Sequence, residues 1–353
     1  MTSRKKKIII LAVRLVIMIV VLAALQNLLM PKYMSGIYEG AMIAEYYDDS
    51  ENHNVIFVGD CEIYENISPV TLYEKYGITS YMRGSAQQLI WQSYYLLEET
   101  LSYEKPDVVV FNVLSMKYGE PQNEAYNRMT LDGMKLSKSK IASIKASMTE
   151  EESFLSYIFP LLRYHSRWSE LTSDDFKYFF KKDRVTFSGY LMRADIKPVT
   201  GTPTAPVLKD YSFSENSYKY LDMMVELCKE NDIQLVLMKA PSIYPYWYDE
   251  WDEAMTEYAK ENDLLYVNFL DHIEDIGIDF EKDTYDGGLH LNVYGAEKLA
   301  DYFGNILVEN FEFTDYTSNK SVKEHWDNIT EEYNAEKKKQ ADLFEEYGYL
   351  KGY

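Results

Sequence analysis

The sequence predicts an α/β fold: a doubly wound, three-layer, parallel sheet of five strands with a helical insertion and a transmembrane helix at its N-terminus. Three observations lead to this prediction. Short runs of apolar, often β-branched residues alternate with segments of helical periodicity. A polar stretch at 115–215 interrupts that alternation, and a long apolar run at 8–30 precedes it.

The apolar run at 8–30 predicts a membrane-spanning helix, which needs about 20 residues. Residues 1–7 form a basic tail that is expected to stay in the cytoplasm, and Arg14 can extend its side chain to the headgroups. A cleaved signal peptide is the alternative, but its apolar core would span about 7–15 residues and a small-x-small cleavage site would follow. We therefore favour an uncleaved signal anchor in the cell membrane, with one span and an extracytoplasmic domain.

After a partly helical connector at 31–51, the alternating segments define an α/β domain at 52–311. Each predicted strand is short and apolar, as expected for buried parallel strands, and each predicted helix has apolar residues on one face. The predicted strands are 54–60, 77–84, 107–113, 233–241 and 264–269. The predicted helices are 69–76, 87–103, 221–228, 251–262 and 295–310.

Two regions lie outside this alternation. The insertion at 115–215 contains helical patches and a Pro- and Thr-rich loop at 197–206, and we interpret it as a lid or substrate-facing cap. Its helical patches are 139–147, 150–164 and 173–181. Residues 312–353 form a charged, Tyr-rich C-terminal tail with one predicted helix at 322–346.

Composition excludes several classes of function. The net charge of −21 repels nucleic acids. The two cysteines, Cys61 and Cys228, are too few for a disulfide framework, and Cys228 lies on an apolar helical stripe typical of a core. The sequence has no zinc, calcium or phosphate-loop motif, so no metal and no cofactor is expected.

Residues with chemical potential follow the predicted strands. The first strand is followed by Gly59, Asp60 and Cys61, the second ends at Gly84, the third ends at Asn112, and Asp286 and His290 follow the fifth. Parallel sheets bind ligands at the carboxyl ends of their strands, so these groups are expected to converge. Together they supply a nucleophile, a base, an orienting carboxylate and donors for an oxyanion.

The segment VIFVGDCEIYEN resembles the first conserved block of the SGNH (GDSL) hydrolases, with Cys61 in place of the serine nucleophile. The resemblance covers about residues 54–311. It implies that His290 acts as base and Asp286 as its orienter, and that the amides of Cys61 and Gly84 and the side chain of Asn112 hold the oxyanion.

The single N-terminal anchor makes the chain most similar to family members that move acyl groups on cell-surface polymers, as in alginate acetylation and teichoic-acid D-alanylation. This similarity implies a surface glycan or acylated polymer as substrate and a membrane O-acyltransferase as partner.

Three departures from the family pattern leave alternatives open. Cys61 replaces serine, three residues rather than two separate Asp286 from His290, and the third block lacks its Gly-x-Asn-Asp form around Asn112. A nearby imidazolium or a helix N-terminus would favour a reactive thiolate at Cys61. The same departures fit a catalytically inactive glycan-binding or scaffold subunit, and a purely structural membrane-tethered protein is a third interpretation.

A second cluster of basic residues lies in the insertion. Arg163, His165 and Arg167 could form an anion pocket with Arg83 that binds substrate, or they could line a solvated helix face.

Overall fold

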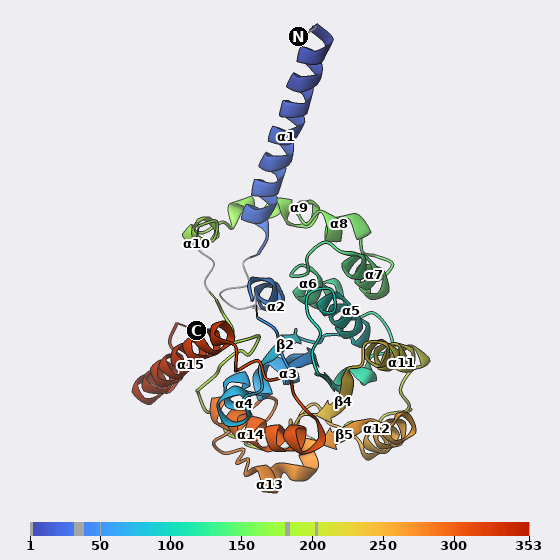
Figure 1. Ribbon diagram of the computed structural model, residues 1–353, viewed down its shortest axis with the longest axis vertical. Coiled ribbons are helices and arrows are strands. Elements are labelled where there is room, and N and C mark those ends of the chain that lie inside the picture. The colour runs from blue at the N-terminus through green and yellow to red at the C-terminus, as the bar shows by residue number, and fades with distance from the viewer. Residues whose placement is uncertain (1–2, 32–38, 50, 181–183, 202–203, 353) are drawn as a thin grey trace.

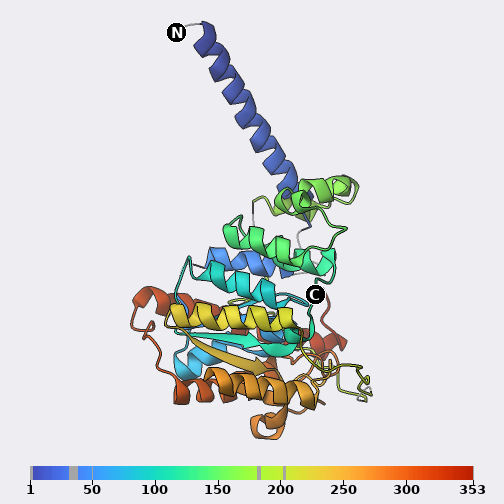
Figure 2. The ribbon, with the colours of Figure 1, turned by 90° about the vertical axis from the view of Figure 1, so that its right-hand side faces the viewer.

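The computed structural model describes residues 3–31, 39–49, 51–180, 184–201 and 204–352. Parts of the connector, the third helical patch and the Pro- and Thr-rich loop lie outside these residues. The first helix, α1 (Ser3–Leu29), projects from the α/β domain in Figures 1 and 2. It is long and apolar enough to cross a membrane, and most of its apolar side chains are exposed.

The sheet has five parallel strands in the order β2-β1-β3-β4-β5, which confirms the predicted fold class. This order is that of a flavodoxin-like doubly wound sheet, whose direction of winding reverses between β1 and β3. The strands are β1 (Val55–Gly59), β2 (Ser80–Gly84), β3 (Val108–Asn112), β4 (Gln234–Lys239) and β5 (Leu265–Asn268).

Helices cover both faces of the sheet (Figure 1) because successive strand residues point to opposite sides. Phe57 and Val110 pack on one face against the first group of helices, and Val58 and Phe111 pack on the other against the second. The first group is α3 (Cys61–Asn66), α4 (Pro69–Tyr76) and α14 (Val293–Asn310). The second is α5 (Ile90–Thr100), α11 (Glu215–Glu230) and α12 (Asp249–Asn262).

The insertion has a helical part and an extended part. Its helices are α6 (Glu124–Leu131), α7 (Lys138–Ser147), α8 (Phe154–Ile158), α9 (Leu161–Tyr164) and α10 (Ser173–Lys177). The last two contact α1, whereas α7 packs on α5. Residues 184–201 run beside the loop that carries Asp286 and His290, since Lys197 exchanges backbone hydrogen bonds with Thr284 and Gly287. This extended part of the insertion borders the candidate site, and Lys117 and Tyr118 at the start of the insertion lie close enough to Asp60 and Cys61 to interact with them electrostatically.

Three further helices are α2 (Glu39–Glu45) in the connector, α13 (Ile273–Ile276) after β5, and the long α15 (Lys320–Tyr347). The last contains the helix predicted at 322–346 and packs on the domain. Tyr333 lies in the core, where Ser68 donates a hydrogen bond to its hydroxyl at 3.0 Å. Trp326 is fully buried and stacks on Tyr73.

Candidate active site

Cys61 is the first residue of α3, directly after β1, at the carboxyl edge of the sheet. Asp60 caps this helix, and its carboxylate accepts a hydrogen bond from the Glu62 amide at 3.2 Å. A side chain at Gly59 would clash with Ile63, and its φ of +155° lies in the region that favours glycine. The Gly-Asp-Cys sequence therefore builds a sharp strand-to-helix turn that presents the thiol at the β1/β3 crevice.

His290 is held beside Cys61 by the loop that leads into α14. Asp286 reaches the imidazole despite the extra intervening residue: its carboxylate lies 2.7 Å from Nδ1 of His290 and also accepts the His290 backbone amide at 2.9 Å. Gly287 and Gly288 both have positive φ values, which lets the loop make this turn. Asn66 anchors the loop by accepting the Leu291 amide at 2.7 Å.

A second carboxylate, which the sequence analysis missed, also contacts His290. Glu65 lies one helical turn after Cys61, and its Oε2 lies 3.2 Å from Nδ1 of His290. The hydroxyl of Tyr285 donates a hydrogen bond to Glu65, and its ring stacks on His290. The spacing of Cys61 and Glu65 at i and i+4 of one helix was the available signal. Nδ1 of His290 thus faces two carboxylates.

These contacts set the protonation of the pair. Burial alone would lower the pKa of His290, but the nearby Glu65, Cys61 and Asp286 raise it well above its ordinary value. Burial raises the pKa of Cys61 to about 11, against the opposing effect of His290. Desolvation of the thiol therefore opposes the thiolate that a neighbouring imidazolium favours.

The second imidazole nitrogen is the one available for chemistry. Nε2 of His290 is buried and makes no hydrogen bond of ordinary geometry with any residue that the structure describes. The ring is nevertheless close enough to Cys61 for each group to shift the pKa of the other. Such a nitrogen can take a proton from the thiol once His290 is neutral.

The predicted oxyanion donors are only partly in place. Gly84 pairs in register with Gly59, and a side chain there would lie 3.1 Å from the Asp60 carbonyl. It therefore borders the turn that carries Cys61. Asn112 does not fit its predicted role: its amide group donates to Asp60 and Glu62, both at 2.9 Å. Both of its hydrogens are occupied, so the donors that remain as predictions are the amides of Cys61 and Gly84.

Behind the turn that carries Cys61 lies a buried charge cluster that the sequence analysis also missed. Nζ of Lys239 lies 2.8 Å from Oε1 of Glu62, and neither side chain is exposed. The Ala240 carbonyl also accepts from Lys239, at 2.7 Å. Burial and the Glu62 carboxylate raise the pKa of the neighbouring Asp60 to about 6. The cluster ties the start of α3 to the end of β4.

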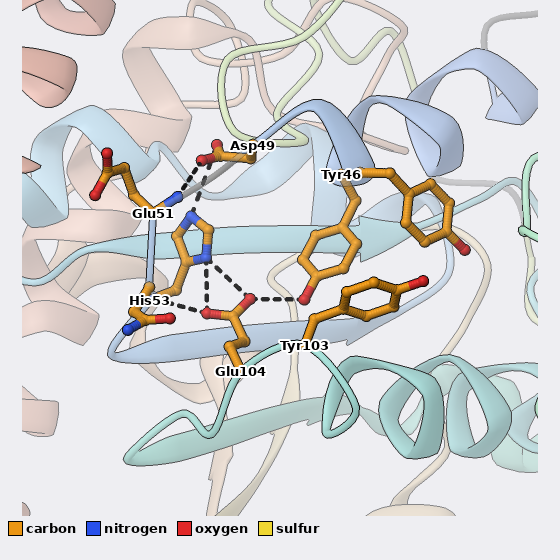
Figure 3. Close-up of a pocket in the computed structure, with 8 residues that line it drawn as sticks. Tyr46, Asp49, Glu51, His53, Tyr103 and Glu104 are labelled. Carbon is orange, nitrogen blue, oxygen red and sulfur yellow. Dashed lines mark hydrogen bonds and ion pairs between the residues drawn. The ribbon is translucent and has the colours of Figure 1, made fainter.

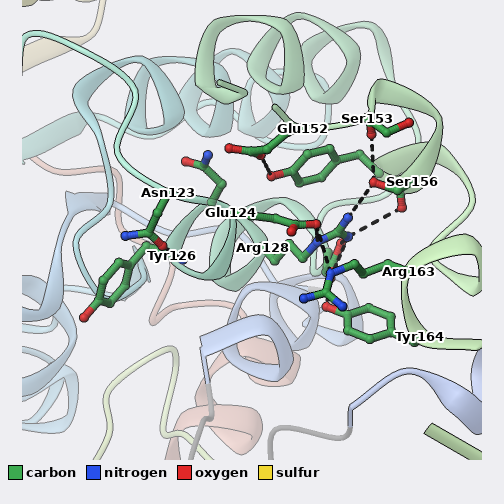
Figure 4. A network of polar contacts seen from close by, with 12 residues as sticks. Asn123, Glu124, Tyr126, Arg128, Glu152, Ser153, Ser156, Arg163 and Tyr164 are labelled. Atoms are coloured by element: carbon green, nitrogen blue, oxygen red, sulfur yellow. Dashed lines mark hydrogen bonds and ion pairs between the residues drawn. The ribbon is translucent and has the colours of Figure 1, made fainter. Parts of the chain in front are cut away.

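The predicted anion pocket does not form. Arg83 is buried and ion-paired with Glu99 at 3.1 Å, with its guanidinium over the ring of Tyr46. Arg163 pairs instead with Glu124, in the network around Arg128 that Figure 4 shows. Arg83 and Arg163 thus pair with different acidic residues, and their guanidinium groups do not face a common pocket.

The other two residues of that prediction lie in the helical insertion as well. Nδ1 of His165 contacts the Leu162 carbonyl at 2.9 Å, and Arg167 pairs with Asp175 at 3.0 Å. Arg167 also donates to the carbonyls of Leu29 and Met30 at the end of α1. Local packing of the insertion therefore uses these side chains, and they do not converge on Arg83.

A separate cavity of about 200 Å³ lies next to His53. Figure 3 shows His53 between Asp49 and Glu104, whose Oε2 lies 3.1 Å from Nδ1. These residues precede β1 and β3, so the cavity is at the amino edge of the sheet, away from Cys61. Among the described residues, no group of His, Cys, Asp and Glu side chains is arranged to hold a metal ion.

No protein-family model and no curated protein sequence matches this chain. Solved structures that resemble it include two GDSL-type proteins and an acylhydrolase, all of low identity. One, from Desulfitobacterium hafniense, is assigned to the G-D-S-L family of lipolytic proteins; it is 14% identical, with a TM-score of 0.36 over 72% of this chain and all of that chain. Another is a GDSL-like lipase from Bacteroides thetaiotaomicron, 13% identical, with a TM-score of 0.36 over 77% of this chain and all of that chain.

A third structure is a protein from Bacteroides fragilis described as an acylhydrolase, 14% identical, with a TM-score of 0.36 over 75% of this chain and 94% of that chain. At these values the three neighbours establish no family. The five-stranded parallel α/β fold with an N-terminal apolar helix rests on the strand order and register of the chain itself.

Proposed function

We propose that this chain is a membrane-anchored, cysteine-dependent ester hydrolase or O-acyltransferase that acts outside the cell membrane on a surface glycan or acylated polymer. One observation carries the proposal: Asp286 and His290 form a hydrogen-bonded pair beside Cys61 at the carboxyl edge of the sheet. A nucleophile next to a base, with a carboxylate that orients the base from its other side, is the arrangement used for acyl transfer.

The proposed reaction has two steps. Sγ of Cys61 attacks the carbonyl carbon of the ester while Nε2 of His290 takes the thiol proton. The C–O bond then breaks, and His290 returns that proton to the departing alkoxide, which leaves an acyl thioester on Cys61. Water in a hydrolase, or a hydroxyl of an acceptor glycan in a transferase, next attacks the thioester while His290 takes its proton; the C–S bond then breaks, and His290 returns the proton to Sγ of Cys61.

The membrane location is part of the proposal. The length and apolar surface of α1 and the basic residues before its apolar run support a single span with a cytoplasmic N-terminus. The domain would then face the cell surface, where a polymer substrate and a membrane O-acyltransferase partner are accessible.

The raised pKa of His290 predicts an alkaline rate profile. His290 must lose a proton before it can accept one from Cys61, so kcat/KM should rise as the pH climbs through the raised pKa of His290. Glu65→Gln removes one of the two carboxylates that face Nδ1 and should lower that pKa. We expect the rise in kcat/KM for p-nitrophenyl acetate to shift to lower pH by about 1–2 units.

Glu74→Gln is the matched control for this measurement. This variant carries the same Glu-to-Gln substitution, but on the exposed surface of α4. We expect the pH profile of the Glu74→Gln variant to coincide with that of the parent chain. A Glu65→Gln profile that does not move, or that moves to higher pH, would contradict the role of His290 as the base.

Two observations favour a second candidate function, a catalytically inactive glycan-binding or scaffold subunit of a surface-polymer acylation system. The Asn112 amide is occupied by carboxylates, and the Cys61 thiol has a raised pKa. This candidate predicts that glycan binding, measured by calorimetry, survives Cys61→Ala and that no ester is turned over at any pH.

A further inference from the structure

The helical part of the insertion exposes an unusual number of large apolar side chains. Trp168 is 71% exposed and Phe180 is 93% exposed. Leu155, Phe159, Leu162 and Phe176 are also more than half exposed. We refer to residues 154–180, which carry these side chains, as the platform. Concentrated exposure of this kind marks an interaction surface, whereas scattered apolar residues are ordinary.

The platform lies where α1 ends. The helices α9 and α10 contact α1, and Figures 1 and 2 show the short helices of the platform lying across its C-terminal end. Arg167 fixes this arrangement, because its guanidinium donates to the carbonyls of Leu29 at 3.1 Å and Met30 at 3.0 Å and also pairs with Asp175. The apolar side chains thus gather at the point where the apolar helix meets the domain.

The composition of the platform fits the boundary between lipid and water. Tryptophan and other aromatic side chains concentrate at the level of the lipid headgroups, where ring and polar groups are both accommodated. Arg163 is half exposed, pairs with Glu124, and lies 5.9 Å from the centre of the Tyr164 ring. Short amphipathic segments with aromatic and basic residues lie in the plane of a bilayer surface.

We propose that the platform binds the outer surface of the phospholipid bilayer that α1 crosses, with Trp168 and Phe180 inserted at headgroup depth. The inference rests on the proposed anchoring by α1 but not on the proposed chemistry of Cys61. Two contacts with the bilayer, a span and a surface platform, fix the orientation of the α/β domain relative to the membrane. A single span would leave the domain free to tilt and rotate.

The quenching of Trp168 by brominated lipid tests this proposal. The full chain is placed as single copies in phosphatidylcholine nanodiscs, with and without bromine near the headgroup end of the acyl chains. Trp168 is the one exposed tryptophan of the five, since Trp91, Trp251 and Trp326 are buried and Trp247 is partly buried in the same core as Trp251. We expect bromine to remove most of the Trp168 emission, and Trp168→Phe to abolish the difference between the two lipids.

Two further variants test whether the quenching of Trp168 depends on the apolar side chains of the platform. Phe159→Ser combined with Phe180→Ser should reduce the quenching, because the platform loses apolar contact with the bilayer. Val207→Ser is the control, because Val207 is about as exposed as Phe180. The neighbouring Pro206 contacts Tyr248 before the start of α12, which lies far from α1 in Figure 1. This variant should leave the quenching unchanged. Equal Trp168 emission in brominated and ordinary lipid would overturn the proposal. The platform would then face water or a second copy of the chain.

Discussion

Cys61→Ala is expected to lower kcat/KM for p-nitrophenyl acetate by at least about 10³-fold, because no thioester can form without the sulfur. Cys61 is the first residue of α3 and lies beside His290, so no other described thiol can replace it there. The rate is followed by release of p-nitrophenol from the purified full chain in detergent. Near-native activity in this variant would exclude Cys61 as the nucleophile.

Cys228→Ala is the control for this loss. Cys228 is the only other cysteine and is buried in the core on α11, where burial raises its pKa to about 12. Its burial in the core keeps it out of reach of a substrate. The variant should keep the parent activity, so a loss in both cysteine variants would indicate a general effect on folding.

Lys239→Met is expected to lower the free energy of unfolding by about 3–5 kcal/mol, because it leaves the Glu62 carboxylate buried without its cation. The pair is fully buried, and among the described residues the Asn112 amide would still donate to Glu62, with Lys117 acting on it only through space. Urea unfolding of the full chain in detergent, followed by tryptophan fluorescence, measures the change as a shift of the midpoint.

Two comparisons interpret the result. The double variant Glu62→Gln, Lys239→Met removes both charges and should regain most of the lost stability. Lys338→Met breaks an exposed pair with Asp342 and should change the free energy of unfolding by less than about 1 kcal/mol. If Lys239→Met behaves like Lys338→Met, the buried pair does not hold the turn that carries Cys61 together.

The sheet could be predicted from the sequence because its three central strands are buried on both faces and are therefore apolar over most of their length. Val108 to Phe111 and Leu235 to Met238 leave no surface for a polar residue, so their pattern is unambiguous. Strand ends were also predictable, because parallel topology places every carboxyl end at one edge. This rule led to Cys61, Asp286 and His290.

The partners of these residues could not be predicted, because they depend on the depth of burial and on side-chain direction. Asn112 ends a strand as expected, but its amide turns toward Asp60 and Glu62 rather than toward substrate. Arg83 lies near the end of β2, yet its side chain points into the second helical layer and pairs with Glu99. The platform was interpreted as a cap because its sequence gives no sign of its proximity to α1.

The central claim is that Cys61 carries the acyl group, and the most direct test is to trap it. The full chain is mixed with p-nitrophenyl acetate, quenched in acid after one turnover, digested with protease and analysed by mass spectrometry. We predict one acetyl group on the peptide that contains Cys61, absent in Cys61→Ala and formed much more slowly in His290→Gln. Turnover with no acetyl on Cys61, or an equal rate of labelling in His290→Gln, would contradict the account.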